Sequence, residues 1–326
     1  MSATTEVDGL DDGPLGRLAL SRSTVDRATQ RRADAEWIAA AWADPRSRVI
    51  VVHKSQALTT EADDGRPELV FTAPADAPEG TQFFLGLDAD DVAYFGVSAT
   101  VEGEAWDRSI ESNVKPAHLR QVGALLSDRD AGLLTHAVAL ANWHDTHTHC
   151  PQCGAATVPA PAGHLTVCPV DGTEHFPRLD PAVIMLVIDA DERLLLARNA
   201  LWPKGRMSVV AGFVEPGESA EHAVAREVFE ETAITVGQVS YLGSQPWPMP
   251  RSLMLGYQAM AKSGQSIAVD EDEIGEARWF SRAELRDAID AGEVGIAPSS
   301  SIARRLIEYW YGAELPDGPA WTPPAR

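Results

Sequence analysis

The chain has 326 residues, 44% of them apolar, and carries 48 acidic side chains against 27 Lys and Arg, a formal net charge of −21. This length suggests about two domains with ordinary packed cores. The negative charge argues against a broad surface for duplex nucleic acid, because neutralising phosphates needs clustered Lys and Arg, but it leaves room for a small phosphorylated ligand held by a metal ion and a few Arg.

Residues 1 to about 35 are polar and are expected to form a loose lead-in. The first sixteen lack the apolar centre of a signal peptide, and no stretch approaches the 18 or so apolar residues of a membrane span, so we expect a cytoplasmic protein without membrane contact. Short apolar runs then predict strands, and two amphipathic segments predict helices. The strands are expected at 48–53, 68–72, 82–87 and 92–97, and the helices at 118–126 and 131–144. Together they predict a β-rich N-terminal domain with two closing helices, residues 1–145.

A cysteine-containing unit follows, predicted over residues 146–178. Cys150 and Cys153 form a Cys-Pro-Gln-Cys turn, and Cys168 begins a second turn, Cys-Pro-Val-Asp, that ends at Asp171. Two such turns facing each other make a zinc ribbon, in which four ligands replace a core too small to fold alone. Asp171 is the first candidate for the fourth ligand, with His149, His164 or His175 as alternatives, and a remnant ribbon held by packing is the other interpretation.

The last predicted domain, residues 179–326, alternates apolar strands with helices. Strands are expected at 182–188, 193–198, 207–210, 239–244 and 253–261; helices are expected from Ser281 to Ile289 and, after Ser300 or Ser301, over 302–311. Strands with helices on both faces predict an α/β sandwich.

The stretch Gly212–Ile234 is the densest chemical pattern in the chain. Pro216-Gly217 ends an apolar run, Ser219 can cap a helix, and the helix carries Glu227, Glu230 and Glu231. Helical spacing places these three acids with Ala220, Ala223 and Val224 on the face expected to pack inward. Such a crowd of carboxylates requires a hard divalent cation such as Mg²⁺ or Mn²⁺, and Arg226 is spaced to orient Glu230. The alternative is an ordinary solvated acidic helix.

This pattern resembles the Nudix box, with Ala233 where the family has Gly. Downstream, Ser244–Met254 holds three alternating prolines with Gln245, Trp247 and Arg251 among them, and Met249 replaces a Phe. That array resembles the NADH pyrophosphatase branch of the Nudix hydrolases, as do the zinc-ribbon position and the run after Ala303. The resemblance implies a Nudix α/β/α sandwich preceded by a degenerate zinc ribbon and a small β-rich domain, an α+β and α/β fold.

The resemblance also implies the site. Glu227, Glu231, Glu273 and the carbonyl of Ala211 match the family's ligands for Mg²⁺ or Mn²⁺, and Glu230 or Glu231 would accept the proton of the attacking water. Residues matching the family's dinucleotide contacts are Arg120, Phe176, Phe213, Gln245, Pro246, Trp247, Pro248, Met249, Pro250, Arg251, Ser252, Glu273 and Ala303.

The expected reaction is hydrolysis of the diphosphate bond of NAD(H) to NMN(H) and AMP, and the same cleavage would remove NAD caps from RNA 5′ ends. Within the same class the substrate could instead be ADP-ribose or another nucleoside-diphosphate conjugate. A non-catalytic dinucleotide sensor is a third alternative, disfavoured because the box acids are intact. A homodimer is implied by the resemblance alone.

Overall fold

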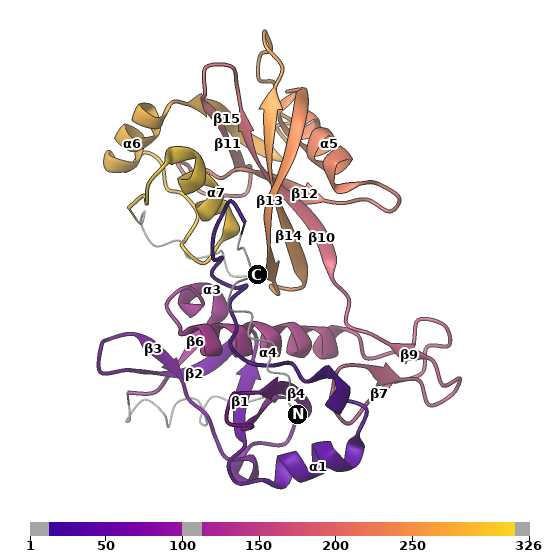
Figure 1. The fold of residues 1–326 in the computed structure, drawn as a ribbon. Coiled ribbons are helices and arrows are strands. Elements are labelled where there is room, and N and C mark those ends of the chain that lie inside the picture. Colours follow the sequence, from indigo (N-terminus) through magenta and orange to yellow (C-terminus); the bar gives the residue numbers. More distant parts are fainter. Residues whose placement is uncertain (1–12, 100–112, 317–326) are drawn as a thin grey trace. The chain divides into compact units, whose positions relative to one another are not determined.

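The computed structural model describes residues 13–99 and 113–316, which divide into two compact units (Figure 1). The first unit comprises Leu20–Leu179 and Pro246–Ser252. The second comprises Asp180–Gln245 and the described parts of Asp11–Ala19 and Leu253–Arg326. The predicted three-domain division stays a prediction. Among the helices of these ranges, none combines the length and apolar character that crossing a bilayer requires.

The first unit is built on a mixed sheet in the order β3-β2-β1-β5-β4, with β6 paired to β2. Strands β1 and β5 are parallel, and the remaining described pairs are antiparallel. The elements are η1 (Thr29–Arg31), α1 (Ala35–Ala43), β1 (Arg48–His53), β2 (Gln56–Glu61), β3 (Pro67–Leu69), η2 (Pro74–Asp76), β4 (Thr81–Leu87), β5 (Ala93–Ser98), β6 (Lys115–His118), α3 (Leu119–Val122) and α4 (Asp128–Thr146).

Successive side chains of these strands point to opposite faces of the sheet, so a separate hydrophobic core lies on each face. Ile50 of β1 packs in a cluster with residues of α4, whereas its neighbour Val49 packs in a second cluster with Ile38 of α1. Because successive strand residues point to opposite faces, α4 and α1 cover opposite faces of the sheet.

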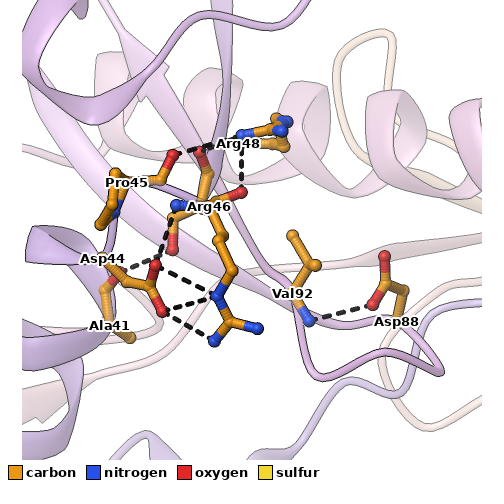
Figure 2. A network of polar contacts seen from close by, with 8 residues as sticks. Ala41, Asp44, Pro45, Arg46, Arg48, Asp88 and Val92 are labelled. Atoms are coloured by element: carbon orange, nitrogen blue, oxygen red, sulfur yellow. Dashed lines mark hydrogen bonds and ion pairs between the residues drawn. The ribbon is translucent and has the colours of Figure 1, made fainter.

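The turn from α1 to β1 is held by polar contacts (Figure 2). Asp44 accepts hydrogen bonds from the Arg46 backbone nitrogen at 2.8 Å and from Arg46 Nη2 at 2.8 Å, and the Arg48 guanidinium donates to the Arg46 carbonyl at 2.6 Å. Arg46 is therefore paired with an acid, as are Arg22, Arg66 and Arg129 of this unit.

The cysteine unit forms a small antiparallel sheet of β7 (Val158–Pro159), β8 (Thr166–Val167) and β9 (Glu174–His175). Two turns flank this sheet with matching geometry. Gly154 and Gly172 each follow the fourth residue of a turn, and both have φ of +74°, a conformation that glycine adopts without strain.

The second unit is a sandwich around a sheet in the order β13-β14-β10-β11-β15, with β12 paired to β10. Figure 1 shows α5 on one side of this sheet and α6 and α7 on the other. The elements are β10 (Asp180–Ile188), β11 (Leu194–Asn199), β12 (Val210–Phe213), α5 (Ala220–Thr232), β13 (Val236–Trp247), β14 (Ser252–Ala261), β15 (Ile274–Phe280), α6 (Arg282–Asp290) and α7 (Ile302–Tyr311).

The continuous apolar run of β10 explains this layering. Val183 and Met185 pack in the cluster that includes Val224 of α5, whereas Ile184 and Leu186 pack in the cluster that includes residues of α6 and α7. A strand buried on both faces needs apolar residues at every position, and β10 supplies them.

The helix that carries the box acids begins and ends as expected. Ser219 accepts a hydrogen bond from the His222 backbone nitrogen at 3.2 Å. Ala233 closes the helix in the left-handed region with φ of +58°, which explains why a relative would use Gly at this position. Ser301 rather than Ser300 caps α7, and Ser281 caps α6 with a full capping box.

Three expectations need correction. The lead-in is not loose throughout, because Leu15 and Leu18 are buried in the core of the second unit and Leu20 is buried in the first. The expected helix at 118–126 is α3, only Leu119–Val122, and the strand expected at 207–210 begins at Val210. Elements α1, β2, β6 and β15 were not expected, because their polar or mixed sequences carry weak periodicity; residues 1–12 lie outside the described ranges.

Candidate active site

The box brings a cluster of carboxylates to one side of α5. Glu227 is 14% exposed, and its carboxylate lies against β12 so closely that a Cβ at Gly212 would sit 1.9 Å from Glu227 Cδ. A side chain at position 212 would displace the Glu227 carboxylate from this place. Ala211, whose carbonyl is a predicted metal ligand, is the preceding residue of β12 and pairs with Ile184.

Arg226 organises the acids around it. Its guanidinium donates to both carboxylate oxygens of Glu218 at 2.9 Å, to Glu227 at 2.8 Å and to Glu230 at 2.9 Å. It also donates to the Phe213 carbonyl at 2.8 Å, which joins the helix to the end of β12. The predicted orientation of Glu230 by Arg226 is confirmed, and the contact to Glu218 shows why the box needs a glutamate in the loop.

The three box acids do not share one environment. Glu230 is 55% exposed, so the expectation that all three face inward is wrong for this residue. Glu231 is partly buried, and within the described part of the chain no donor pairs with it. Burial, followed by the charges of Glu227 and Glu273, raises the pKa of Glu231 to about 8. Burial also raises the pKa of Glu227.

A carboxylate that is half removed from water and has no donor fits a cation site. Glu227, Glu231 and Glu273 repel one another, as their effects on the Glu231 pKa show, and oxygen ligands of this kind suit a hard divalent ion. The alternative of an ordinary solvated acidic helix does not explain the burial of Glu227 and Glu231.

The cysteine unit brings together a second cluster. Ligand atoms of Cys150, Cys153, Cys168 and Asp171 all lie within 4.8 Å of one another. The two turns are equivalent: the nitrogens of Cys150 and Cys168 each donate to the carbonyl five residues ahead, so Asp171 occupies the place that Cys153 has in the first turn. None of His149, His164 and His175 joins this cluster of described residues.

The proline array belongs to the first unit. In its stretch Pro246–Ser252, called here the recognition segment, Trp247 and Met249 pack against the core that includes α4. The Arg120 guanidinium lies 5.4 Å from the Trp247 ring centroid, a cation–π contact. Asn142 of α4, which the sequence did not single out, donates to the Pro248 carbonyl at 2.6 Å.

Other predicted ligand contacts are distributed over both units. Phe176 is 64% exposed in the first unit, and Phe213 is 58% exposed in the second. Ala303 is buried, with its nitrogen bonded to the Ser301 hydroxyl at 3.2 Å. Gln245 differs from expectation: it is fully buried and donates to the Ser300 carbonyl at 3.0 Å, so its amide serves the packing of the second unit in this conformation.

Comparison with known proteins decides the family. Residues 178–298 match the profile described as NUDIX domain, residues 46–143 the NADH pyrophosphatase-like rudimentary NUDIX domain, and residues 145–176 the NADH pyrophosphatase zinc ribbon domain. The chain is 40% identical to the NAD-capped RNA hydrolase NudC of Mycobacterium tuberculosis over 325 residues, 95% of this chain and all of that one. The chain belongs to the NADH pyrophosphatase branch of the NUDIX family.

Other members are more distant. The NAD-capped RNA hydrolase NUDT12 of Macaca fascicularis is 33% identical over 335 residues, 89% of this chain and 72% of that one. A solved NUDIX hydrolase from Nitrosomonas europaea is 20% identical, with a TM-score of 0.39, and covers 51% of this chain and 94% of its own.

Membership in this branch identifies the cysteine cluster as part of a zinc ribbon, since the zinc ribbon model matches these residues. We expect Asp171→Ala to weaken zinc binding more than about tenfold, because losing even an outer partner of a ligand costs about that much. Asp171→Cys should keep one zinc per chain and bind it more tightly. Metal analysis after competition with a chelator measures both. Glu174→Ala, an exposed acid outside the cluster, is the control; equal zinc retention by Asp171→Ala and the wild type would exclude Asp171 as a ligand.

The metal-free NUDIX unit should become less stable as pH rises. The folded state holds the Glu231 proton more tightly than the unfolded chain does, so its stabilisation is present below the unfolded pKa of about 4.3 and is lost as pH rises through about 8. We expect Tm without added divalent ions to fall between pH 6 and pH 8, and Mn²⁺ to raise Tm more at pH 8. Glu231→Gln should flatten both responses; identical pH profiles in the two proteins would contradict the assignment.

Proposed function

We propose that this NUDIX hydrolase cleaves the diphosphate bond of NAD(H), giving NMN(H) and AMP, and removes NAD caps from RNA. The observation that carries this proposal is the partly buried pair Glu227 and Glu231, with the charge of Glu273 beside them, in a chain 40% identical over its length to NAD-capped RNA hydrolases. The reaction adds water across the bridge: one phosphorus gains the hydroxyl, and the bridging oxygen leaves with the other phosphate and takes a proton.

We infer that Glu227, Glu231, Glu273 and the Ala211 carbonyl would hold the divalent ion, Mg²⁺ or Mn²⁺. When bound, such an ion neutralises the diphosphate and lowers the pKa of a water molecule. The chain's own contribution is positional. Arg226 fixes Glu227 through its Oε1 at 2.8 Å, and Glu230 through its Oε2 at 2.9 Å. Glu231, which no donor among the described residues engages, is the first candidate to accept a proton, and Glu230, which is bonded to Arg226, is the alternative.

Ligand contacts extend the proposal. The exposed rings of Phe176 and Phe213 are free to stack on a base or nicotinamide, and the recognition segment with Arg120 supplies aromatic and cationic contacts. The backbone at Ala303 and Glu273 complete the proposed dinucleotide contacts. Exposed apolar side chains support a homodimer, and three cysteines without a disulfide support a cytoplasmic setting.

Chromatography of the products tests the function directly. Purified protein with Mg²⁺ or Mn²⁺ should convert NADH to NMNH and AMP, and should release an RNA with a 5′ monophosphate from NAD-capped RNA. Turnover of ADP-ribose at a higher kcat/KM than NADH would favour the second candidate substrate, and binding of NADH without turnover would favour a sensor.

Asn142 is expected to position the recognition segment. Its amide donates to the Pro248 carbonyl at 2.6 Å and to Ser55 Oγ at 3.1 Å, and Pro248 is buried. Asn142→Ala leaves this carbonyl without its donor, which costs as much as a buried hydrogen bond. We therefore expect KM for NADH to rise about tenfold with a smaller change in kcat.

Thr146→Ala is the matched control for Asn142→Ala. Thr146 lies one turn further along α4 and bonds within its own helix, to the Asn142 carbonyl at 2.7 Å. Steady-state kinetics of both variants, with Tm to verify folding, separates positioning from general destabilisation. An unchanged KM in folded Asn142→Ala protein would exclude the positioning role.

A further inference from the structure

Four side chains that carry or can carry positive charge lie near the outer edge of β4, apart from the box acids and from the cysteine cluster. Among the described strands, β4 pairs with β5 alone and so lies at the edge of the sheet. Its other edge is covered by two segments: the Asp26 nitrogen donates to the Leu87 carbonyl at 2.9 Å, and the Phe84 nitrogen donates to the Ala162 carbonyl at 3.0 Å. The first segment leads into Arg27 and Arg32, and the second leads into His164.

The histidines of this cluster are in direct contact. The ring centroids of His164 and His136 of α4 lie 5.2 Å apart, and His164 Nε2 lies 2.6 Å from the Phe84 carbonyl oxygen. This hydrogen bond makes Nε2 the donor, so Nδ1 is the ring nitrogen left for another partner. Burial, together with the charges of Arg27 and Arg32, lowers the pKa of both histidines, to about 4 for His164.

Arg27 and Arg32 differ from four other arginines of the first unit in having no acidic partner among the described residues. In the same unit Arg22, Arg46, Arg66 and Arg129 each form an ion pair with an aspartate. Within the described ranges no carboxylate pairs with Arg27 or Arg32, although the chain has 48 acids against 27 Lys and Arg. Arg32 donates to the Arg27 carbonyl at 3.4 Å, and its Nε is buried without a hydrogen-bond partner.

Such an arrangement is costly without a counter-charge. Desolvation lowers the pKa of both guanidinium groups, and for Arg32 the charge of Arg27 adds to this effect. Arg32 is partly buried, whereas Arg27 is exposed to solvent. Like charges held close together repel, and an anion between them would remove this penalty. A guanidinium presents a fork of N–H donors that matches the oxygens of phosphate.

We propose that Arg27, Arg32, His136 and His164 form a binding site for a phosphate group, separate from the diphosphate-cleaving carboxylates. The phosphate could come from inorganic phosphate or from a phosphodiester of bound RNA, because both present the same oxygens to the arginines. Two guanidinium groups can donate several hydrogen bonds to one ligand. The site therefore suits the oxygens of a phosphate better than a halide ion or a single carboxylate.

Phosphate binding can be measured on the zinc-containing protein without added Mg²⁺ or Mn²⁺, where the box carboxylates repel anions. We expect inorganic phosphate, compared with chloride at equal ionic strength, to raise Tm of the wild type and to broaden its own ³¹P signal. In the Arg27→Gln/Arg32→Gln variant, Kd for phosphate should weaken about tenfold or more, because two charge-assisted hydrogen-bond donors are lost. Arg46→Gln, which removes an arginine already paired with Asp44 (Figure 2), should bind phosphate as the wild type does.

Two further arms complete the test. Arg27→Lys/Arg32→Lys keeps the charges and guards against misfolding of the glutamine variant; it should bind phosphate with intermediate affinity. A short RNA without a cap that displaces phosphate from the wild type identifies a phosphodiester as the ligand, and failure to displace it identifies free phosphate. Equal phosphate affinity in the wild type and in both folded double variants would overturn the proposal.

Discussion

Glu231→Gln should lower kcat/KM for NADH by about three orders of magnitude with saturating Mg²⁺, while the fold remains intact. The expected loss combines the loss of a carboxylate that would hold the divalent ion with the loss of a proton acceptor, and proton transfer alone typically contributes a factor of 10² to 10⁴. Glutamine has nearly the same shape, so packing around Val224 and Val228 is preserved. Removing one of three mutually repelling carboxylates should even raise Tm of the metal-free protein above pH 7.

Glu230→Gln is the matched control, because the two acids are adjacent in the sequence but differ in environment. Glu230 is 55% exposed and bonded to Arg226, so we expect its replacement to lower kcat/KM less than about tenfold. Single-turnover rates with NADH and chromatographic product analysis measure both effects. A kcat for Glu231→Gln within a few-fold of the wild type, or a larger loss for Glu230→Gln, would reverse the proposed roles.

The sandwich and its box were predictable because their signals are local. The run of β10 is apolar at every position, which only a strand covered on both faces requires, and the structure covers it with α5 on one face and α6 and α7 on the other. The helix start at Ser219 follows from its hydroxyl, and the left-handed residue Ala233 follows from the position where the family has Gly.

The environments of the acids were harder to predict. Helical spacing groups Glu227, Glu230 and Glu231 within about a third of a turn, but it does not define where the edge of the buried face lies. The contact between Glu227 and the backbone at Gly212 draws the helix toward β12 and leaves Glu230 at the rim with Arg226. That boundary depends on packing between distant segments.

The sequence also does not predict which of the two units a short segment packs against. Leu15 and Leu18 lie in a polar stretch, yet they fill the core of the second unit. The recognition segment leaves the unit of its neighbours and joins the first, where Trp247 meets Arg120 and Pro248 meets Asn142. The residues around Asn142 do not predict its contact with Pro248, because a single amide in an apolar helix gives no periodic pattern.

Arg226→Ala should lower kcat/KM for NADH about 100-fold or more and reduce Tm by several degrees. Arg226 is the described cation that holds Glu218, Glu227 and Glu230 together, and its loss leaves three acids facing one another. The pKa of Glu218, held low chiefly by its hydrogen bond with Arg226, should return toward its ordinary value. The Phe213 carbonyl also loses its donor, so the end of β12 is freed from α5.

The dependence on Mg²⁺ separates positioning from stability in this variant. If Arg226 acts by placing Glu227, the Mg²⁺ concentration for half-maximal rate should rise in Arg226→Ala, and added Mg²⁺ should recover part of the activity.

Arg226→Lys keeps a charge but not the planar guanidinium that reaches both oxygens of Glu218 and the other acids, so this variant should recover little activity. Arg193→Ala is the control, because Arg193 pairs with Asp189 and Asp191 in the β10–β11 turn; its kinetics should match the wild type. Loss of Tm in Arg226→Ala with no change in Mg²⁺ dependence would show that Arg226 only stabilises the fold.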